Sequence, residues 1–230
     1  MPTIEIKRVD LEERLGETLS VDRLSKLLTL VKGEVKEWTE DTLKLELNDS
    51  NRPDLWSLEG IARQIRIHQR GTMGIPPSYS FFKQKAKQKI FVSKEVMAVR
   101  PYLSGFLVSG LTITKSVLSR LIQSQEKLAD IFGQKRKTVS IGLYPLRKIT
   151  FPVHYNLVDP DTTRFTPLGF DTPMSLREIL RNHPKGIAYG GILKDCSRLP
   201  ILMDANNQIL SFPPITVSYT HLTLPTTPYV

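Results

Sequence analysis

The chain has 230 residues, of which 40% are hydrophobic and 24% charged, as in globular proteins with one large or two small cores. We expect no membrane span and no targeting leader, since the apolar runs are short, and we therefore expect a cytoplasmic protein. Cys196 is the single cysteine and the four histidines are scattered, which excludes a disulfide framework and argues against a metal site.

The net charge of +9 is distributed unevenly along the chain. Residues 1–60 carry 9 Lys/Arg against 14 Asp/Glu, whereas the remainder carries 23 against 9. An excess of positive charge in the later part favours a polyanionic partner, most plausibly a nucleic acid. A basic surface that serves only solubility explains the same numbers.

The first 75 residues predict a small α+β domain. A strand is expected over residues 3–9 and a helical turn over 10–15. Ser20 is a good N-cap for a helix that runs to about Lys32 and ends at Gly33. A hairpin should follow over residues 35–38 and 43–47, and a second helix should begin near Leu55 and end at Gly71.

Residues 76–89 predict a basic linker. Glycines and prolines crowd residues 71–80, and lysines alternate just beyond them at Lys83, Lys85, Lys87 and Lys89. If this stretch is extended, the lysines form a one-sided stripe. A solvated linker is the simpler interpretation.

Residues 90–215 predict a larger, mixed-sheet α+β domain. Strands are expected over residues 90–92, 105–113, 138–144 and 153–158. A strong helix should cover residues 115–132, burying Leu118, Leu121, Ile122, Leu128, Ala129 and Phe132. Ser175 and Glu178 have the spacing of a capping box for a further helix. The basic run Lys135, Arg136 and Lys137 follows the strong helix and is a candidate nucleic-acid-binding element.

The organising stretch is residues 199–215, LPILMDANNQILSFPPI, which predicts a β-hairpin. Asn206 and Asn207 tolerate the left-handed backbone of a tight turn, and Pro213-Pro214 must end the second strand. Ser211 should therefore lie at the end of a stiff strand, opposite Leu202. A hydroxyl beside an apolar wall is typical of a binding pocket, although an ordinary core hairpin with a surface serine is the simpler interpretation.

Catalytic motifs are absent from the sequence: we find no phosphate loop and no nucleophile elbow. A pairing of Ser211 with His154 or His183 in space stays open. The residues alone thus indicate a basic, two-domain protein with one candidate pocket.

Several segments together resemble one family. They are NRPDLWSLEGIAR (51–63), RPY (100–102), QEKL (125–128), GQKRK with the following residues to 142, FTPLG (165–169), residues 185–190 and LSFPPI (210–215). In this order they are similar to the β subunit of archaeal/eukaryotic phenylalanyl-tRNA synthetase, and the compactness of the chain points to the archaeal branch.

The resemblance implies a small N-terminal domain followed by an editing domain that hydrolyses tRNA(Phe) mischarged with tyrosine. It implies Ser211 as the polar, catalytic contact of the editing site and Leu202 as its wall, both binding substrate. The partners would be tRNA(Phe) and an α subunit in a heterotetramer of two α and two β chains, with no membrane. We expect no cofactor in this part; ATP and Mg²⁺ would serve the holoenzyme.

Residues 216–230 depart from the resemblance. They carry no charged side chain, unlike the family's continuation, and we expect a non-native tail that takes no part in the fold. Without the family's next strand the editing pocket would be incomplete. The alternative function is therefore a non-catalytic tRNA-binding or scaffold module.

Overall fold

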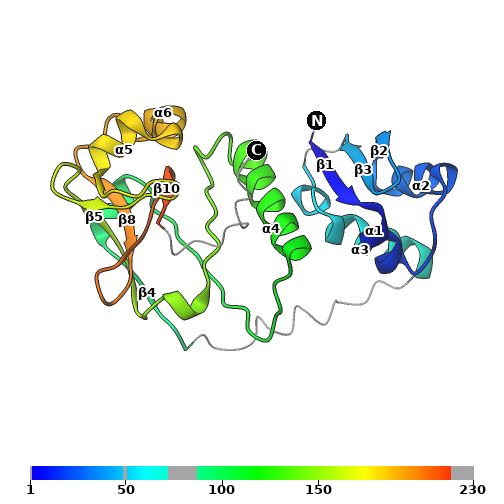
Figure 1. Ribbon diagram of the computed structural model, residues 1–230, viewed down its shortest axis with the longest axis horizontal. Helices are drawn as coiled ribbons and strands as arrows, with labels where there is room; N and C mark the ends of the chain where they lie inside the picture. Colours follow the sequence, from blue (N-terminus) through cyan, green and yellow to red (C-terminus); the bar gives the residue numbers. More distant parts are fainter. Residues whose placement is uncertain (1, 49–50, 72–86, 219–230) are drawn as a thin grey trace. The chain divides into compact units, whose positions relative to one another are not determined.

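The computed structural model describes residues 2–48, 51–71 and 87–218. These residues form two compact units (Figure 1). The first unit comprises residues 1–84 and 114–132, and the second comprises residues 85–113 and 133–230. Both contain helices and sheets, so the predicted α+β class is confirmed. Within the described ranges, no helix has the length and apolar character needed to cross a membrane.

The first unit is an antiparallel sheet in the order β1-β3-β2 with helices around it (Figure 1). Ser20 and Ser57 cap α2 and α3, accepting hydrogen bonds from the Arg23 and Gly60 amides at 3.2 Å each. The expected hairpin and both expected helices are confirmed. The elements are β1 (Thr3–Lys7), α1 (Arg8–Leu15), α2 (Val21–Leu28), η1 (Thr29–Val31), β2 (Gly33–Trp38), β3 (Thr42–Leu47), η2 (Pro53–Leu55) and α3 (Leu58–Arg70).

Helix α4 (Lys115–Lys127), continued by the π-helical turn η5 (Leu128–Phe132), completes the first unit. Arg120 pairs with Asp10 of α1 and, at 3.0 Å, with Glu59 of α3. Gln123 donates to the carbonyl oxygen of Glu5 at 2.9 Å. By chain order we expected this helix in the second domain; its packing instead assigns it to the first unit.

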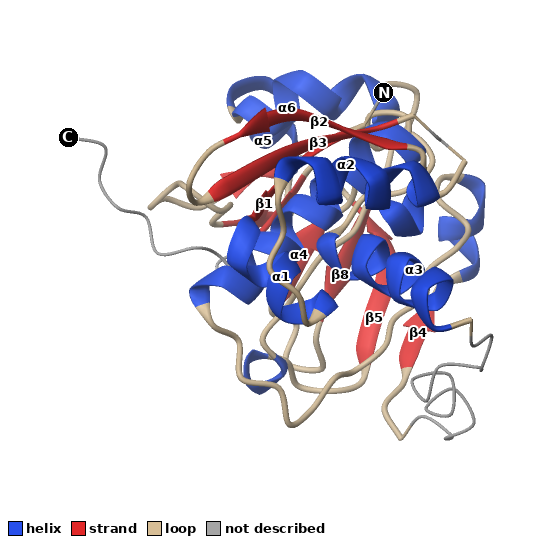
Figure 2. Cartoon of the chain, turned by 90° about the vertical axis from the view of Figure 1, so that its right-hand side faces the viewer, coloured by secondary structure: helices blue, strands red, loops and turns tan. Residues whose placement is uncertain are grey.

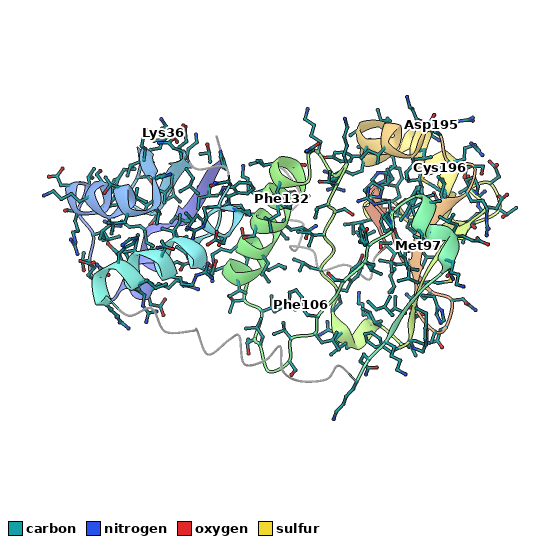
Figure 3. The ribbon with its side chains drawn as sticks, turned by 180° about the vertical axis from the view of Figure 1, so that it is seen from behind. Lys36, Met97, Phe106, Phe132, Asp195 and Cys196 are labelled. Atoms are coloured by element: carbon teal, nitrogen blue, oxygen red, sulfur yellow. The ribbon has the colours of Figure 1, made fainter. Side chains whose placement is uncertain are left out.

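The apolar stripe expected on α4 is only partly buried. Leu118 and Ala129 are buried, and Leu128 packs against the core of the first unit. Phe132 is 55% exposed (Figure 3), so its prediction as a core residue is wrong.

The second unit is built on a mixed sheet in the order β10-β9-β8-β5-β4, in which β4 and β5 are parallel and the other pairs antiparallel. Figure 2 shows β4, β5 and β8 next to one another. The elements are β4 (Ile90–Val92), η4 (Lys94–Ala98), η6 (Leu146–Lys148), β5 (Val153–Val158), β6 (Arg164–Phe165), β7 (Met174–Ser175), α5 (Leu176–Asn182), α6 (Pro184–Tyr189), η7 (Gly190–Leu193), β8 (Leu199–Met203), β9 (Ile209–Phe212) and β10 (Thr216–Val217).

Helix α5 contributes to the core on one face of this sheet. Its first turn carries the predicted capping box, in which Ser175 Oγ and the Glu178 carboxylate each accept an amide hydrogen bond from the other residue. Leu176 and Ile179 of α5 cluster with Ile201 and Phe212 of the hairpin. One face of β8 and β9 is therefore apolar and packed against α5. Leu202 and Ser211, which alternate with Ile201 and Phe212, project to the opposite face.

Two expected strands of the second unit are wrong. Residues 105–113 and 138–144 have no strand assignment in the described chain. Phe106, which is 84% exposed (Figure 3), and Leu111 show that the first segment lacks an apolar surface to pack on. Alternating apolar residues form a strand only where a partner supplies the ladder and the burial, because β-propensity depends on context.

The end of the chain also differs from expectation. Thr216–Val217 form β10, which pairs with β9, and the Ser218 amide donates to the carbonyl oxygen of Leu210 at 3.0 Å. The expectation that residues 216–218 take no part in the fold is therefore wrong. It relied on their lack of charged side chains, and a short edge strand does not need any. Residues 219–230 of the expected tail, and residues 76–86 of the expected linker with Lys83 and Lys85, lie outside the described residues.

Candidate functional site

The hairpin of β8 and β9 is held closed by Asp204, which is buried. Its Oδ1 accepts hydrogen bonds from the amides of Asn206 and Gln208 at 2.9 Å each, and its Oδ2 from the amide of Thr150 at 3.2 Å. Asn207 takes the left-handed conformation, with φ of 60°. The predicted hairpin and its Asn-containing turn are confirmed, and Asp204 is the carboxylate that closes the turn.

Ser211 and Leu202 are directly paired across β8 and β9, as the sequence predicted. Tyr155 of β5 pairs with Leu202 on the other side of β8, and Val217 of β10 pairs with Ser211. Residues paired across strands project to the same face of a sheet. We call Tyr155, Leu202, Ser211 and Val217 the site row.

The hydroxyl of Ser211 is buried in this row. Among the described residues, Ser211 Oγ has no hydrogen-bond partner at good geometry, although the Tyr144 hydroxyl lies close enough to interact with it. The Tyr144 ring also lies against Gly142, where an added Cβ would meet the phenol oxygen at 2.6 Å. Gly142 therefore leaves the space that lets Tyr144 reach Ser211.

The two tyrosines of the site stay neutral. Burial raises the pKa of Tyr144 to about 12, with a smaller opposing effect from Ser211. Burial also raises the pKa of Tyr155, against the charge of Arg100, which favours the phenolate. Neutral phenols offer both a donor and an acceptor, so the region around Ser211 is suited to hydrogen-bonding another hydroxyl group.

Arg136 does not project into solvent with the rest of the basic run. Its Nη1 donates to the carbonyl oxygens of Pro214 and Ile215 at 3.2 and 3.0 Å, and its guanidinium lies 4.5 Å from the ring centre of Tyr189. Lys135 and Lys137 are exposed. The run thus contains two cations available to a polyanion and one engaged in the fold.

Neither His154 nor His183 joins Ser211 in a catalytic pair. His154 precedes Tyr155 on β5 and so projects to the opposite face from the site row. His183 caps α6: its Nδ1 accepts from the Lys185 amide at 3.0 Å, leaving Nε2 to donate to the Leu168 carbonyl oxygen at 3.2 Å. The Ser–His pairing that the sequence left open is therefore wrong.

Other nucleophiles and metal ligands are not assembled in the described part of the chain. Burial, followed by the charge of the neighbouring Asp195, raises the pKa of the Cys196 thiol, so this thiol is protonated near neutral pH (Figure 3). Among the described residues, no three His, Cys, Asp or Glu side chains are placed to hold a metal ion.

Sequence reasoning found Ser211 and Leu202 but missed Tyr144, Tyr155 and Arg100 as their neighbours. Arg100 belongs to a segment that carried the family resemblance, and so does Gly142, which lies against Tyr144, whereas Tyr155 belongs to none. The periodicity of the sequence could not predict these neighbours, because it shows which residues share a face of one helix or strand and not which separate segments meet.

Comparisons with known proteins find similar sequences and a similar structure, although no family model matches the chain. It is 42% identical over 226 residues to the phenylalanine–tRNA ligase beta subunit of Borrelia hermsii, covering 95% of this chain and 39% of that protein. The corresponding subunit of Borrelia recurrentis is 41% identical over 222 residues. The chain therefore spans about two fifths of the length of these curated relatives.

A solved structure matches in three dimensions as well. The crystal structure of an N-terminal fragment of the phenylalanyl-tRNA synthetase beta subunit from Pyrococcus horikoshii superposes with a TM-score of 0.85 and 35% identity. The match covers 97% of this chain and 65% of that one. Sequence and structure together establish that this chain is a homologue of the N-terminal part of the phenylalanine–tRNA ligase beta subunit.

Proposed function

We propose that the chain serves in the attachment of phenylalanine to tRNA(Phe), as the N-terminal part of a ligase β subunit. Its second unit would carry an editing site that hydrolyses Tyr-tRNA(Phe). The observation that carries the first statement is the identity of 42% to a beta subunit over 95% of the chain. The second rests on the buried Ser211 hydroxyl beside Leu202 and two neutral tyrosines.

Discrimination between phenylalanine and tyrosine explains why such an enzyme needs a second site. A hydrophobic pocket rejects an analogue that only adds a hydroxyl by about a hundredfold. A separate site that binds the extra hydroxyl removes the error by hydrolysis. Tyr144 and Ser211 would supply hydrogen-bonding partners for that hydroxyl, and Leu202 and Tyr155 would contact the ring.

The reaction in such a site requires water and no protein nucleophile. Water adds to the ester carbonyl, the aminoacyl bond to the tRNA ribose breaks, and tyrosine and free tRNA leave. Positioning the water and the ester supplies much of the rate enhancement. The described residues place no histidine on the Ser211 hydroxyl, which is compatible with this chemistry, because Ser211 would bind and orient rather than attack.

The remaining partners belong to the complete enzyme. We propose that the complete β subunit assembles with an α subunit into a tetramer of two α and two β chains. ATP, Mg²⁺ and phenylalanine activation would lie in α, and this chain would use no cofactor of its own. The exposed cations Lys135 and Lys137 would contact tRNA phosphates.

The test is substitution of Ser211 and Leu202 in the complete β subunit assembled with α. Ser211→Ala should slow deacylation of Tyr-tRNA(Phe) about tenfold or more, since one positioned hydroxyl is lost, and leave Phe-tRNA(Phe) synthesis unchanged. Its free energy of unfolding should change by less than about 1 kcal/mol, because Ser211 Oγ makes no hydrogen bond of good geometry to lose. Leu202→Ala should slow deacylation and also cost about 1–2 kcal/mol of stability.

Parental deacylation by both variants would contradict the editing site. The chain could instead bind tRNA and be needed for Phe charging while hydrolysis does not depend on Ser211. That result would support the non-catalytic tRNA-binding module.

A further inference from the structure

The side chain of Arg136 connects three parts of the second unit. Its Nη1 donates to two successive carbonyl oxygens, those of Pro214 and Ile215, while the face of its guanidinium lies over the Tyr189 ring at 4.5 Å. The charged group of Arg136 therefore contacts other parts of the protein. Arginine suits this role because its planar fork donates in fixed directions and stacks on an aromatic ring at the same time.

The two carbonyl oxygens belong to the corner between β9 and β10. Ser211 lies on β9 just before this corner and pairs with Val217 just after it. The Ile215 amide closes the corner by donating to the Phe212 carbonyl oxygen at 2.8 Å. A shift of the corner would therefore move both strands that fix the position of Ser211.

The backbone that presents Arg136 has an unusual conformation. Gln134, Lys135 and Arg136 are consecutive residues with φ of 49°, 55° and 66°. Side-chain-bearing residues rarely adopt left-handed conformations in succession, because each one brings its Cβ close to a carbonyl oxygen. The surrounding structure must hold such a turn in place.

Arg100 supplies part of that support. Its Nη1 donates to the carbonyl oxygen of Lys137 at 3.1 Å and lies 3.4 Å from that of Arg136. The charge of Arg100 also acts on Tyr155, the residue of the site row that pairs with Leu202. The left-handed turn is thus tied to the same face of the sheet that carries Ser211.

We propose that Arg136 is a positioning residue of the editing site: stacked on Tyr189, its guanidinium donates to the carbonyl oxygens of the β9–β10 corner, and so fixes Ser211. This inference rests on the proposed function. It separates Arg136 from Lys135 and Lys137, with which it forms one basic run in the sequence. Lysine cannot replace it, because an ammonium group lacks the planar face that stacks on Tyr189.

A double-mutant cycle in the complete β subunit assembled with α tests the inference. Arg136→Lys should slow deacylation of Tyr-tRNA(Phe) on the order of ten- to a hundredfold, as a displacement of about 1 Å does. Phenylalanine charging and the salt dependence of tRNA(Phe) binding should stay at parental values. In a Ser211→Ala background, Arg136→Lys should have no further effect, since it acts through Ser211. Arg181→Lys, at an exposed arginine of α5, is the matched control.

The outcomes separate this inference from the proposed function. Unchanged deacylation by Ser211→Ala would overturn the assigned site. Slower deacylation by Ser211→Ala but not by Arg136→Lys, or additive losses, would overturn only the role of Arg136. If Arg136→Lys fails to fold, Tyr189→Leu removes the ring beneath the guanidinium and should slow deacylation. Tyr189→Phe keeps the ring and should deacylate Tyr-tRNA(Phe) at the parental rate. Equal rates for these two variants would also overturn the inference.

Discussion

The two units bury different kinds of residue. In the first unit, eighteen aliphatic, tryptophan and alanine residues form one continuous core, drawn from every helix and strand up to α3 except β2. The main cluster of the second unit holds eight. All the buried polar or charged residues found in the described chain lie in the second unit: Ser175, His183, Asp204, Ser211, Thr216 and Ser218.

The difference indicates where function is placed. A dense apolar core stabilises a unit by packing, and packing does not depend on the geometry of hydrogen bonds. Buried polar groups need partners, and Ser211 lacks a partner of good geometry within the described residues. Trp56 Nε1 of the first unit is also buried without a partner among the described residues, so a missing partner alone does not mark a site. The set of buried polar side chains supports our proposal that the second unit carries the editing site.

The largest effect on stability should come from crowding the first unit. Gly60 lies in the first turn of α3, where an added Cβ would overlap the carbonyl oxygen of Asp54. Because that obstacle is backbone, it cannot rotate away. Gly60→Ala should lower the free energy of unfolding by about 3 kcal/mol, measured by urea denaturation.

Gly71→Ala is the matched control on the same helix. Gly71 ends α3 with φ of 63°, but nothing lies within 4 Å of its added Cβ. Only the left-handed conformation is then penalised, at about 1 kcal/mol. If both variants lose the same free energy of unfolding, the close approach of Gly60 to the Asp54 carbonyl oxygen does not matter for the stability of the unit.

A second, smaller effect should come from the ion pairs that hold α4 to the first unit. The side chains of Arg120 and Asp10 are only 16% and 18% exposed, and Ser116 Oγ donates to the same carboxylate at 2.9 Å. Arg120→Met should cost about 1–2 kcal/mol, because Asp10 stays partly buried with a lost partner.

An exposed pair provides the contrast for Arg120. Arg23 and Glu17 lie 3.1 Å apart with side chains 45% and 30% exposed. Arg23→Met should change stability by less than about 0.5 kcal/mol in the same denaturation experiment. A loss at Arg120 as small as that at Arg23 would contradict the assignment of α4 as a firmly held helix.

The same contrast decided how much of the fold could be predicted from the sequence. In the first unit, caps such as Ser20 and Ser57, the terminating Gly71 and the leucine spacing all agree with one another, and the elements were predicted. In the second unit, residues 105–113 and 138–144 look like strands locally but have no ladder among the described residues. Local pattern cannot supply a partner that comes from elsewhere in the chain.

The candidate site was predictable to the same limited degree. Leu202 and Ser211 belong to one hairpin, so turn chemistry fixed their pairing in advance. Tyr144, Tyr155 and Arg100 come from three other segments and required the sheet order. Arg136 was grouped with Lys135 and Lys137 by charge alone, and only the fold shows that a left-handed turn directs it inward.

The third prediction tests whether buried polar groups make the second unit pH-sensitive. Burial lowers the pKa of His183 below its usual 6.5, against the hydrogen bond to the Leu168 carbonyl. The unfolded chain then takes up a proton near pH 6.5 while the folded chain does not. Stability should be complete above about pH 6.5 and fall as the pH drops through that value toward the lower folded pKa.

His183→Asn is the control for this pH dependence. Asparagine can still accept the Lys185 amide at the N-cap but does not titrate in this range. Urea midpoints measured between pH 5 and 8 should therefore fall less steeply toward acid in the variant. A parental slope in His183→Asn would assign the acid sensitivity to other groups.

The smallest effect concerns the cations left free of the fold in the basic run. Lys135 and Lys137 are exposed, and each phosphate contact that they make should contribute about 0.7–0.9 to the slope of log K against log salt. Lys135→Ala with Lys137→Ala should therefore lower the slope of the salt dependence of tRNA(Phe) binding by up to about 1.8 and weaken binding at low salt. Arg136→Lys should leave the slope unchanged, because the Arg136 guanidinium binds the carbonyl oxygens of Pro214 and Ile215. An unchanged slope in the double lysine variant would show that the run is only a solvated surface. A flattened slope in Arg136→Lys would show instead that Arg136 leaves the fold to contact RNA.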